Sequence, residues 1–350
     1  MKFTAIWQGT AFGEYAWLMR LFEPYIEKQC FDGEYKIVLD NAILFDKFVH
    51  IRDKSYYTQF NGKNVFLVHL NDETYEGGDY SQYRNFRGVF RNYWSDGFNT
   101  DGVMTLPLGH PKSDPWQAPE LAASKRPYLW SFLGQAEKSS RPEVLHALRS
   151  VEPNFIHTTD TRPDGTRPAL LTRQKCDQVL HESVFAPCPM GNVNLDSFRV
   201  YEALEAGTIP IVERRLTLDY FRSMLGKHPL PTVSSWNGAR KLILTLRNNP
   251  AKMNALQNEC RDWWQDYLVR LGGEIGQFLE RRSSESRQVE PLRHGFVASA
   301  GWKYLELMRH HSASGIGRRI KRQFLRIVKE KRWRHTYLAP KTPPVARRDS

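Results

Sequence analysis

Residues Val184–Glu213 read VFAPCPMGNVNLDSFRVYEALEAGTIPIVE. The stretch begins with an apolar run, Val184–Cys188, and closes with another, Ile209–Val212, each typical of a buried strand. Between them, Ser197–Ala206 carries apolar residues at helical spacing and is followed by Gly207, which can terminate a helix. A strand, a helix and a second strand in this order form one crossover of a parallel sheet, whose ligands lie at the carboxyl ends of the strands. The stretch therefore predicts an α/β fold with a ligand at the loop that follows the first strand.

The residues of that loop and of the helix start are suited to bind an anion. Gly191 allows backbone N–H groups to come close to a ligand, and Asp196 or Ser197 can cap the helix that follows. A helix N-terminus attracts phosphate groups, and Arg199 adds further donors, so a diphosphate fits here. Glu202, one turn on, can accept hydrogen bonds from ribose hydroxyls. The alternative is an ordinary strand–loop–helix unit in which the arginine and the glutamate form a surface ion pair.

The same alternation of strands and helices runs through most of the chain, which predicts two Rossmann-like domains that face each other across a cleft. The predicted domains are 1–112 and 128–285, joined by a Pro-, Ser- and Ala-rich linker at 113–127 and followed by a helical extension with a basic tail at 286–350. The expected strands are Phe3–Trp7, Tyr35–Leu39, Asn64–Leu70, Gly88–Trp94, Val103–Leu108, Tyr128–Leu133 and Asn154–His157, and the expected helices are Glu14–Gln29, Arg141–Ser150 and Leu171–His181.

Composition is that of a globular protein, with 41% hydrophobic and 25% charged residues among 350, enough for two cores. The four cysteines are far apart and form no CxxC pair, so we expect neither a disulfide framework nor a zinc site, which fits a reducing compartment. The segment Met1–Gly9 is too short and too polar for a signal peptide, and no apolar run is long enough for a membrane helix. These features predict a cytoplasmic protein.

The positive charge of the chain is concentrated in its C-terminal tail. Ser314–Ser350 holds 12 of the 50 Lys and Arg residues but two of the 38 acidic ones, while the net charge of the whole chain is +12. Apolar residues recur through this tail at helical spacing, from Ile316 to Val328. Such a helix can lie on an anionic membrane, here the inner surface, which would suit an enzyme that acts on a lipid-linked acceptor. The alternative is a helix that docks on the protein with a solvated basic face.

The central stretch resembles the exostosin-type glycosyltransferases, and its segment Gly191–Asn194 is similar to the ribitol xylosyltransferase branch of that superfamily. Upstream, Val68–Glu73 and Phe90–Trp94 are similar to the N-terminal domain of that branch. The residues that carry the superfamily signature are Ser183-Val184-Phe185, Pro189-Met190-Gly191, Ser197-Phe198-Arg199, Glu202-Ala203-Leu204, Gly207 and Ile209-Pro210.

The resemblance implies a GT-B fold, a nucleotide-sugar donor that is usually UDP-linked, a glycan or glycolipid hydroxyl as acceptor, transfer with inversion, and no required metal or cofactor. It also implies that the domain 1–112 lies on the acceptor side and that the domain 128–285 binds the nucleotide-sugar. The sequence contains no Asp-x-Asp pair, the metal-holding motif of the other main glycosyltransferase fold. Arg141 follows a Phe-x-Gly match and is a second phosphate candidate, with an exposed helix-start arginine as its alternative. The residues expected to bind the donor are Arg91, Gly134, Arg141, Gly191, Asn192, Asn194, Ser197, Arg199 and Glu202.

Transfer with inversion also needs a base on the N-terminal domain to deprotonate the acceptor hydroxyl. Glu73 is the first candidate and Asp72 the second, because both follow an apolar strand; Asp96 is a rival. For each of the three, the alternative is a solvated loop acid. Arg91 ends the neighbouring strand and is expected to reach the diphosphate from across the cleft, or else to form a salt bridge with the acidic loop 76–79.

Three other classes of protein are alternatives to a glycosyltransferase. A nucleic-acid binder is disfavoured because the charge outside the tail is nearly balanced and no binding motif occurs, so nucleic acid is not expected as a partner. A dinucleotide-dependent dehydrogenase is disfavoured because no GxGxxG follows a strand. A non-catalytic sugar-binding or scaffold protein that kept the fold stays open.

Overall fold

The computed structural model describes residues 1–9, 13–31, 40–47, 49, 52–76, 80–111, 121–161, 165–166, 168–285, 287–290 and 300–311. Residues 1–310 form one compact unit. The expected strand Tyr35–Leu39, the linker residues 113–120 and the basic tail Ser314–Ser350 lie outside the described residues.

The first sheet contains six parallel strands in the order β2-β1-β3-β4-β5-β6, and it confirms the expected α/β character of the N-terminal half. Helix α1 begins at Tyr15 and ends at Phe22, and a short 3-10 turn that contains Pro24 follows it. The expected helix Glu14–Gln29 is therefore wrong in its second half, because proline has no N–H to donate and disfavours a helical conformation in the residue before it. The strands are β1 Phe3–Gln8, β2 Ile26–Cys30, β3 Ala42–Asp46, β4 Val65–His69, β5 Gly88–Arg91 and β6 Val103–Thr105.

The second sheet contains five parallel strands in the order β11-β10-β9-β7-β8. The chain runs from β7 to the neighbour on one side, β8, and then back to the neighbour on the other side, β9. The carboxyl ends of β7 and β9 therefore flank the switch point of the sheet, the place where ligands bind in folds of this kind. The elements are β7 Tyr128–Gly134, α2 Arg141–Leu148, β8 Asn154–Thr158, α3 Arg173–His181, β9 Ser183–Cys188, α4 Phe198–Glu205, β10 Ile209–Glu213, α5 Tyr220–Leu225, β11 Thr232–Val233 and α6 Trp236–Arg247.

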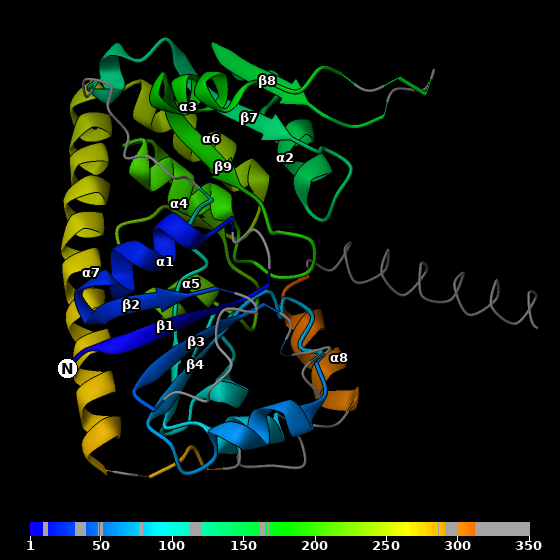
Figure 1. Ribbon diagram of the computed structural model, residues 1–350. Coiled ribbons are helices and arrows are strands. Elements are labelled where there is room, and N and C mark those ends of the chain that lie inside the picture. Colours follow the sequence, from blue (N-terminus) through cyan, green and yellow to red (C-terminus); the bar gives the residue numbers. More distant parts are fainter. Residues whose placement is uncertain are drawn as a thin grey trace, which may run out of the picture. The chain divides into compact units, whose positions relative to one another are not determined.

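A long helix, α7, runs from Pro250 to Glu285 beside both sheets (Figure 1). It contacts α4, α6 and β10 in the second half of the chain and α1 and β5 in the first half. The ring of Phe278 packs against Phe90, with 4.9 Å between ring centroids, and buried Arg282 donates a hydrogen bond to the carbonyl of Arg87. A segment that the sequence placed in the C-terminal domain thus also supports the first sheet.

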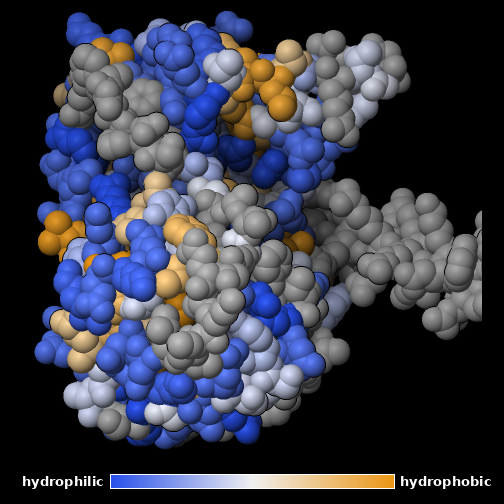
Figure 2. All heavy atoms as spheres, in the orientation of Figure 1, coloured by the Kyte–Doolittle hydropathy of each residue, from blue (hydrophilic) through white to orange (hydrophobic). Residues whose placement is uncertain are grey.

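The last described helix, α8 Ala300–Arg309, is held to residues of both halves. The Arg309 guanidinium lies 3.1 Å from the carboxylate of Asp96, and Leu195 donates its backbone N–H to Nδ1 of His310. In the view of Figure 2, most of the surface of the described residues is hydrophilic, and an apolar area is exposed where Figure 1 draws β7 and β8. None of the described helices combines the length and apolar character needed to cross a membrane.

Candidate functional site

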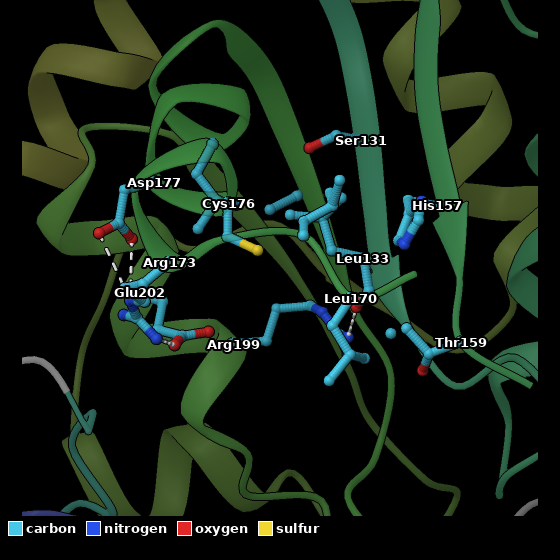
Figure 3. Close-up of a pocket in the computed structure, with 14 residues that line it drawn as sticks. Ser131, Leu133, His157, Thr159, Leu170, Arg173, Cys176, Asp177, Arg199 and Glu202 are labelled. Atoms are coloured by element: carbon cyan, nitrogen blue, oxygen red, sulfur yellow. Dashed lines mark hydrogen bonds and ion pairs between the residues drawn. The ribbon is translucent and has the colours of Figure 1, made fainter. Parts of the chain in front are cut away.

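Two hollows meet at the switch point of the second sheet. The first, here called the cleft, has a volume of about 270 Å³ and is lined by residues of both halves of the chain, among them Glu73, Tyr93 and Arg141. The second, here called the side pocket, has a volume of about 280 Å³ and lies between β7, β8 and α3 (Figure 3). Arg199 and Glu202 line both hollows, so the first turn of α4 forms the boundary between them.

Arg199 is held in place by the neighbouring strand β7. Its Nη2 donates a hydrogen bond to the carbonyl of Leu133 at 2.5 Å, and its guanidinium carbon lies 4.9 Å from the centroid of the Phe132 ring. Gly134, at φ +120°, ends the strand in a backbone conformation that side chains rarely adopt, and a Cβ there would lie 3.4 Å from the Arg199 guanidinium. Burial lowers the pKa of Arg199. The arginine is therefore a fixed, partly desolvated cation, which is suited to bind an anion tightly.

Glu202 lies one turn further along α4 and faces the side pocket. Its carboxylate accepts a hydrogen bond from Arg173 at 3.0 Å, and Arg173 also forms an ion pair with Asp177 (Figure 3). The pair links α4 to α3 at the mouth of the pocket. Sequence reasoning missed Arg173, because the arginine stands at the start of a helix with no motif around it and enters the site through the packing of α3 on α4.

Two donors in the cleft have no hydrogen-bond partner among the described residues, the Nε of Arg141 and the Oγ of Ser197. Arg141 donates through Nη1 to the carbonyl of Gln135 at 3.1 Å, and burial, followed by the charge of Arg199, lowers its pKa to about 10. Ser197 stands at the N-cap of α4 and is 8% exposed, yet its side chain makes no capping bond. Unpaired buried donors are unusual in native proteins. Together with the N-terminus of α4 they make this part of the cleft suited to an anion.

The loop after β9 is brought against the first half of the chain through Glu73. The Glu73 carboxylate accepts hydrogen bonds from the backbone N–H groups of Asn192 and Val193, both at 2.9 Å, and from the Asn192 side-chain amide at 3.1 Å. A Cβ at Gly191 would lie 3.0 Å from Glu73 Oε1, so a glycine is needed for this approach. The structure thus brings the first-choice base candidate and the expected donor loop into direct contact.

Asp72 and Arg91 do not line either hollow, contrary to the sequence expectation. Asp72 is 1% exposed and accepts hydrogen bonds from the Tyr80 hydroxyl at 2.7 Å and from Arg91 at 3.4 Å. Arg91 is fully buried, donates to the Tyr83 hydroxyl, and stacks on the Phe98 ring at 3.4 Å from its centroid. Arg91 therefore stabilises the core beneath the cleft. The alternative expectation, that Arg91 forms a salt bridge, is correct, and the acid with which Arg91 pairs is Asp72.

Asn194 is also buried, and it shapes the loop rather than lining the cleft. Its side-chain amide donates to the Tyr75 hydroxyl at 3.0 Å, and its side-chain oxygen accepts the backbone N–H of Asp196 at 2.9 Å. Asp96, the rival base, pairs with Arg309 and has a 65% exposed side chain, which fits the reading of a solvated loop acid. Within the part of the chain that the structure describes, no three His, Cys, Asp or Glu side chains gather as a metal site would require.

Asp196 is a site residue that the sequence offered only as a helix cap. It is 1% exposed, lines the cleft, and accepts hydrogen bonds from the hydroxyls of Tyr201 at 2.8 Å and Tyr220 at 3.4 Å. Burial raises its pKa to about 7, although these hydrogen bonds oppose the shift. In the sequence, Asp196 is recognisable only as an acid just before a helix. That pattern does not distinguish a solvated helix cap from a buried acid.

The two parallel sheets, with a cleft at the switch point of the second, have the GT-B fold of glycosyltransferases. The family model of the RXYLT1 C-terminal domain matches residues 110–266. The chain is similar to mouse ribitol-5-phosphate xylosyltransferase 1, with 29% identity over 71% of this chain and 64% of that protein. It is similar to the human protein of the same name, with 32% identity over 55% of this chain and 47% of that protein.

Among solved structures, Alr3699/HepE of Anabaena in complex with UDP has the same fold, with a TM-score of 0.50 and 10% identity. The match covers 80% of this chain and 100% of that chain. The matched region spans less than two thirds of the mouse and human relatives. The comparisons therefore show the fold, and the activity of this chain is a proposal.

Proposed function

We propose that the chain is a glycosyltransferase that moves a sugar from a UDP-linked donor to a hydroxyl of a glycan or glycolipid, with inversion at the anomeric carbon. The observation that carries this proposal is the convergence of Arg141, Ser197 and Arg199 with the N-terminus of α4 on one cleft. The choice of UDP is supported by the UDP bound to a protein of the same fold. The choice of a glycosyl acceptor is supported by the names of the relatives.

The proposed positions of the donor follow from the two hollows. The diphosphate lies in the cleft on Arg141, Arg199 and Ser197, and the nucleoside enters the side pocket, where Glu202 accepts hydrogen bonds from the ribose hydroxyls. Arginines and a helix N-terminus stabilise the negative charge that develops on the departing diphosphate without the need for a metal. Glu73, from the opposite half, is the proposed base that accepts the proton of the acceptor hydroxyl.

The first test is a binding measurement by calorimetry, with UDP and a panel of UDP-sugars as ligands. We expect UDP to bind the unsubstituted protein and the Arg199→Ala variant to lose about 30-fold or more in affinity, since loss of a buried charged hydrogen bond costs about 2–5 kcal/mol. Arg149→Ala is the matched control, because Arg149 is an exposed arginine of the α2 C-cap that lines neither hollow. Equal affinity in all three proteins would contradict the donor site.

The second test concerns turnover and metals. If positive side chains neutralise the diphosphate, transfer measured with the best sugar of the panel should continue in EDTA. If EDTA abolished transfer and added manganese or magnesium restored it, this result would contradict the metal-independent mechanism. Binding of UDP-sugars without any transfer or hydrolysis would instead favour a sugar-binding protein that kept the fold.

We also propose a cytoplasmic location. The four cysteines, all among the described residues, are free thiols in the structure, as is usual in reducing compartments. We propose separately that the basic tail associates with the inner membrane surface.

A further inference from the structure

Oxygen Oε1 of Glu73 lies where three consecutive backbone N–H groups converge. The donors are Asn192 at 2.9 Å, Val193 at 2.9 Å and Asn194 at 3.3 Å. Successive N–H groups that point into one concavity form a nest, which is an anion-binding arrangement in many phosphate sites. In the structure this nest is filled by a carboxylate that comes from the other half of the chain.

The nest is held in shape by contacts that do not involve Glu73. The N–H of Gly191 donates to the carbonyl of Asn194 at 2.7 Å, and Ser139 donates its hydroxyl to the carbonyls of Gly191 and Asn192. The side chain of Asn194 is fixed by Tyr75 on one side and by the backbone of Asp196 on the other. The three N–H groups therefore remain converged when the carboxylate leaves.

The cleft offers more hydrogen-bond donors than one carboxylate uses. Arg141 and Ser197 line the same hollow as Glu73, and the buried Nε of Arg141 and Oγ of Ser197 lack partners among the described residues. A carboxylate that fills the nest cannot also satisfy these two donors, whereas a diphosphate has enough oxygen atoms to bind the nest and both of them. These hydrogen-bond donors together match an anion larger than the Glu73 carboxylate, which now occupies the nest.

We propose that Glu73 is an internal stand-in for a phosphate of the donor. The donor diphosphate takes over the N–H groups of 192–194 and displaces the Glu73 carboxylate, which then becomes available to the acceptor hydroxyl. This inference rests on the proposed function and deepens it, since it makes the donor bind first and the acceptor second. An internal competitor also weakens donor binding. The apparent affinity for the donor is the intrinsic affinity multiplied by the fraction of molecules in which the nest is free.

The first experiment measures UDP affinity by calorimetry in Glu73→Ala and Glu73→Asp. The alanine variant has no competing group, and the aspartate variant keeps the charge but is one methylene too short to fill the nest. We expect both to bind UDP about tenfold more tightly than the unsubstituted protein, which corresponds to a nest that is free in about one molecule in ten. Simple relief of charge repulsion would strengthen binding in the alanine variant alone, and that result would overturn the proposal.

Glu137→Gln is the matched control, because Glu137 is an exposed acid beyond the carboxyl end of β7 that lines neither hollow. Its UDP affinity should equal that of the unsubstituted protein. A gain as large as in the Glu73 variants would mean that any lost acid strengthens binding, and it would overturn the proposal.

The second experiment measures hydrogen exchange of the backbone amides at 192–194. In the unsubstituted protein, Glu73 should protect them; in Glu73→Ala they should exchange faster, and UDP should restore the protection. If UDP binds but leaves these amides unprotected in the variant, the diphosphate does not use the nest and the inference is wrong. If the unsubstituted protein does not bind UDP at all, the proposed function itself fails.

Discussion

Asp72 and Glu73 are neighbours in the chain, yet Asp72 lies in the core and Glu73 lies in the cleft. Asp72 is the buried counterion of Arg91, whose guanidinium is fully enclosed. We expect Asp72→Asn to lower the free energy of unfolding by about 3–5 kcal/mol, because it leaves a buried charge without its partner. Urea unfolding measures this loss, and Glu137→Gln, at an exposed acid, is the control, with an expected change below about 1 kcal/mol.

If Asp72→Asn unfolds at the same urea concentration as the unsubstituted protein but does not transfer sugar, the structural role assigned to Asp72 is wrong. Asp72 would then again be a candidate for the catalytic base.

The buried acid Asp196 makes stability depend on pH. Burial raises the pKa of Asp196 from 3.8 to about 7 in the folded protein. Between these values the folded state keeps a proton that the unfolded state has released, so the contribution of Asp196 to the free energy of unfolding falls as the pH rises through this window. We expect Asp196→Asn, which mimics the protonated acid, to be as stable as the unsubstituted protein at pH 4 and more stable at pH 8.

Urea unfolding of both proteins across this pH range checks the expectation. Identical pH profiles would show that Asp196 titrates in the folded protein as it does in water.

The donor-site residues differ in how far the sequence could predict them. The positions of Arg141, Ser197, Arg199 and Glu202 at the cleft were predictable because they follow from a local pattern, a helix that starts after the end of a strand. Arg91 was misplaced because its burial depends on Phe98 and other aromatic residues, which enclose it only after the first half has folded.

At the level of secondary structure, the second sheet was largely predictable, whereas two strands of the first sheet, β2 and β3, were not predicted. The βαβ units around β9 and β10 follow one another with short loops, so that apolar runs and caps mark each element. In the first half, β3 went unpredicted because Ala42–Asp46 is a short apolar run without alternation, which periodicity alone cannot assign. The helix α1 was extended too far because its apolar spacing continues past Pro24 into β2.

The packing of α7 on the first sheet can be tested with two glycines. A Cβ at Gly88, in β5, would lie 2.6 Å from the Phe278 ring, whereas a Cβ at Gly273, in α7 itself, would meet nothing within 4 Å. Gly88→Ala should therefore lower the free energy of unfolding by about 1–3 kcal/mol through overpacking. Gly273→Ala should raise it by about 1 kcal/mol, because alanine favours the helix. Thermal unfolding of both variants checks the signs, and a neutral Gly88→Ala would contradict the contact between α7 and β5.

Across residues 1–310, the two halves are joined by α7, which contacts elements of both, and by polar contacts between the halves. Trp94 donates its backbone N–H to the Tyr220 hydroxyl at 3.0 Å, and Arg20 pairs with Glu205 at 2.8 Å. These contacts, like that of Glu73 with its loop, are hydrogen bonds and ion pairs whose groups can exchange partners with a ligand or water. Movement of Glu73 therefore requires no change in the core.

The basic tail lies beyond the matched family model, which ends at residue 266. Ser314–Ser350 holds 12 Lys and Arg residues beside an apolar pattern of helical spacing. Anionic lipid attracts such a segment by about 1 kcal/mol for each basic residue near the surface, and salt screens the attraction. Removal of the chain from Ser314 onward should release the protein from anionic vesicles in a flotation assay, and added salt should reproduce part of this effect. Transfer to a small soluble acceptor should continue, because the proposed donor site lies in residues 134–202. If the truncated protein instead loses its unfolding transition, the apolar residues of the tail belong to the core, and the membrane proposal is wrong.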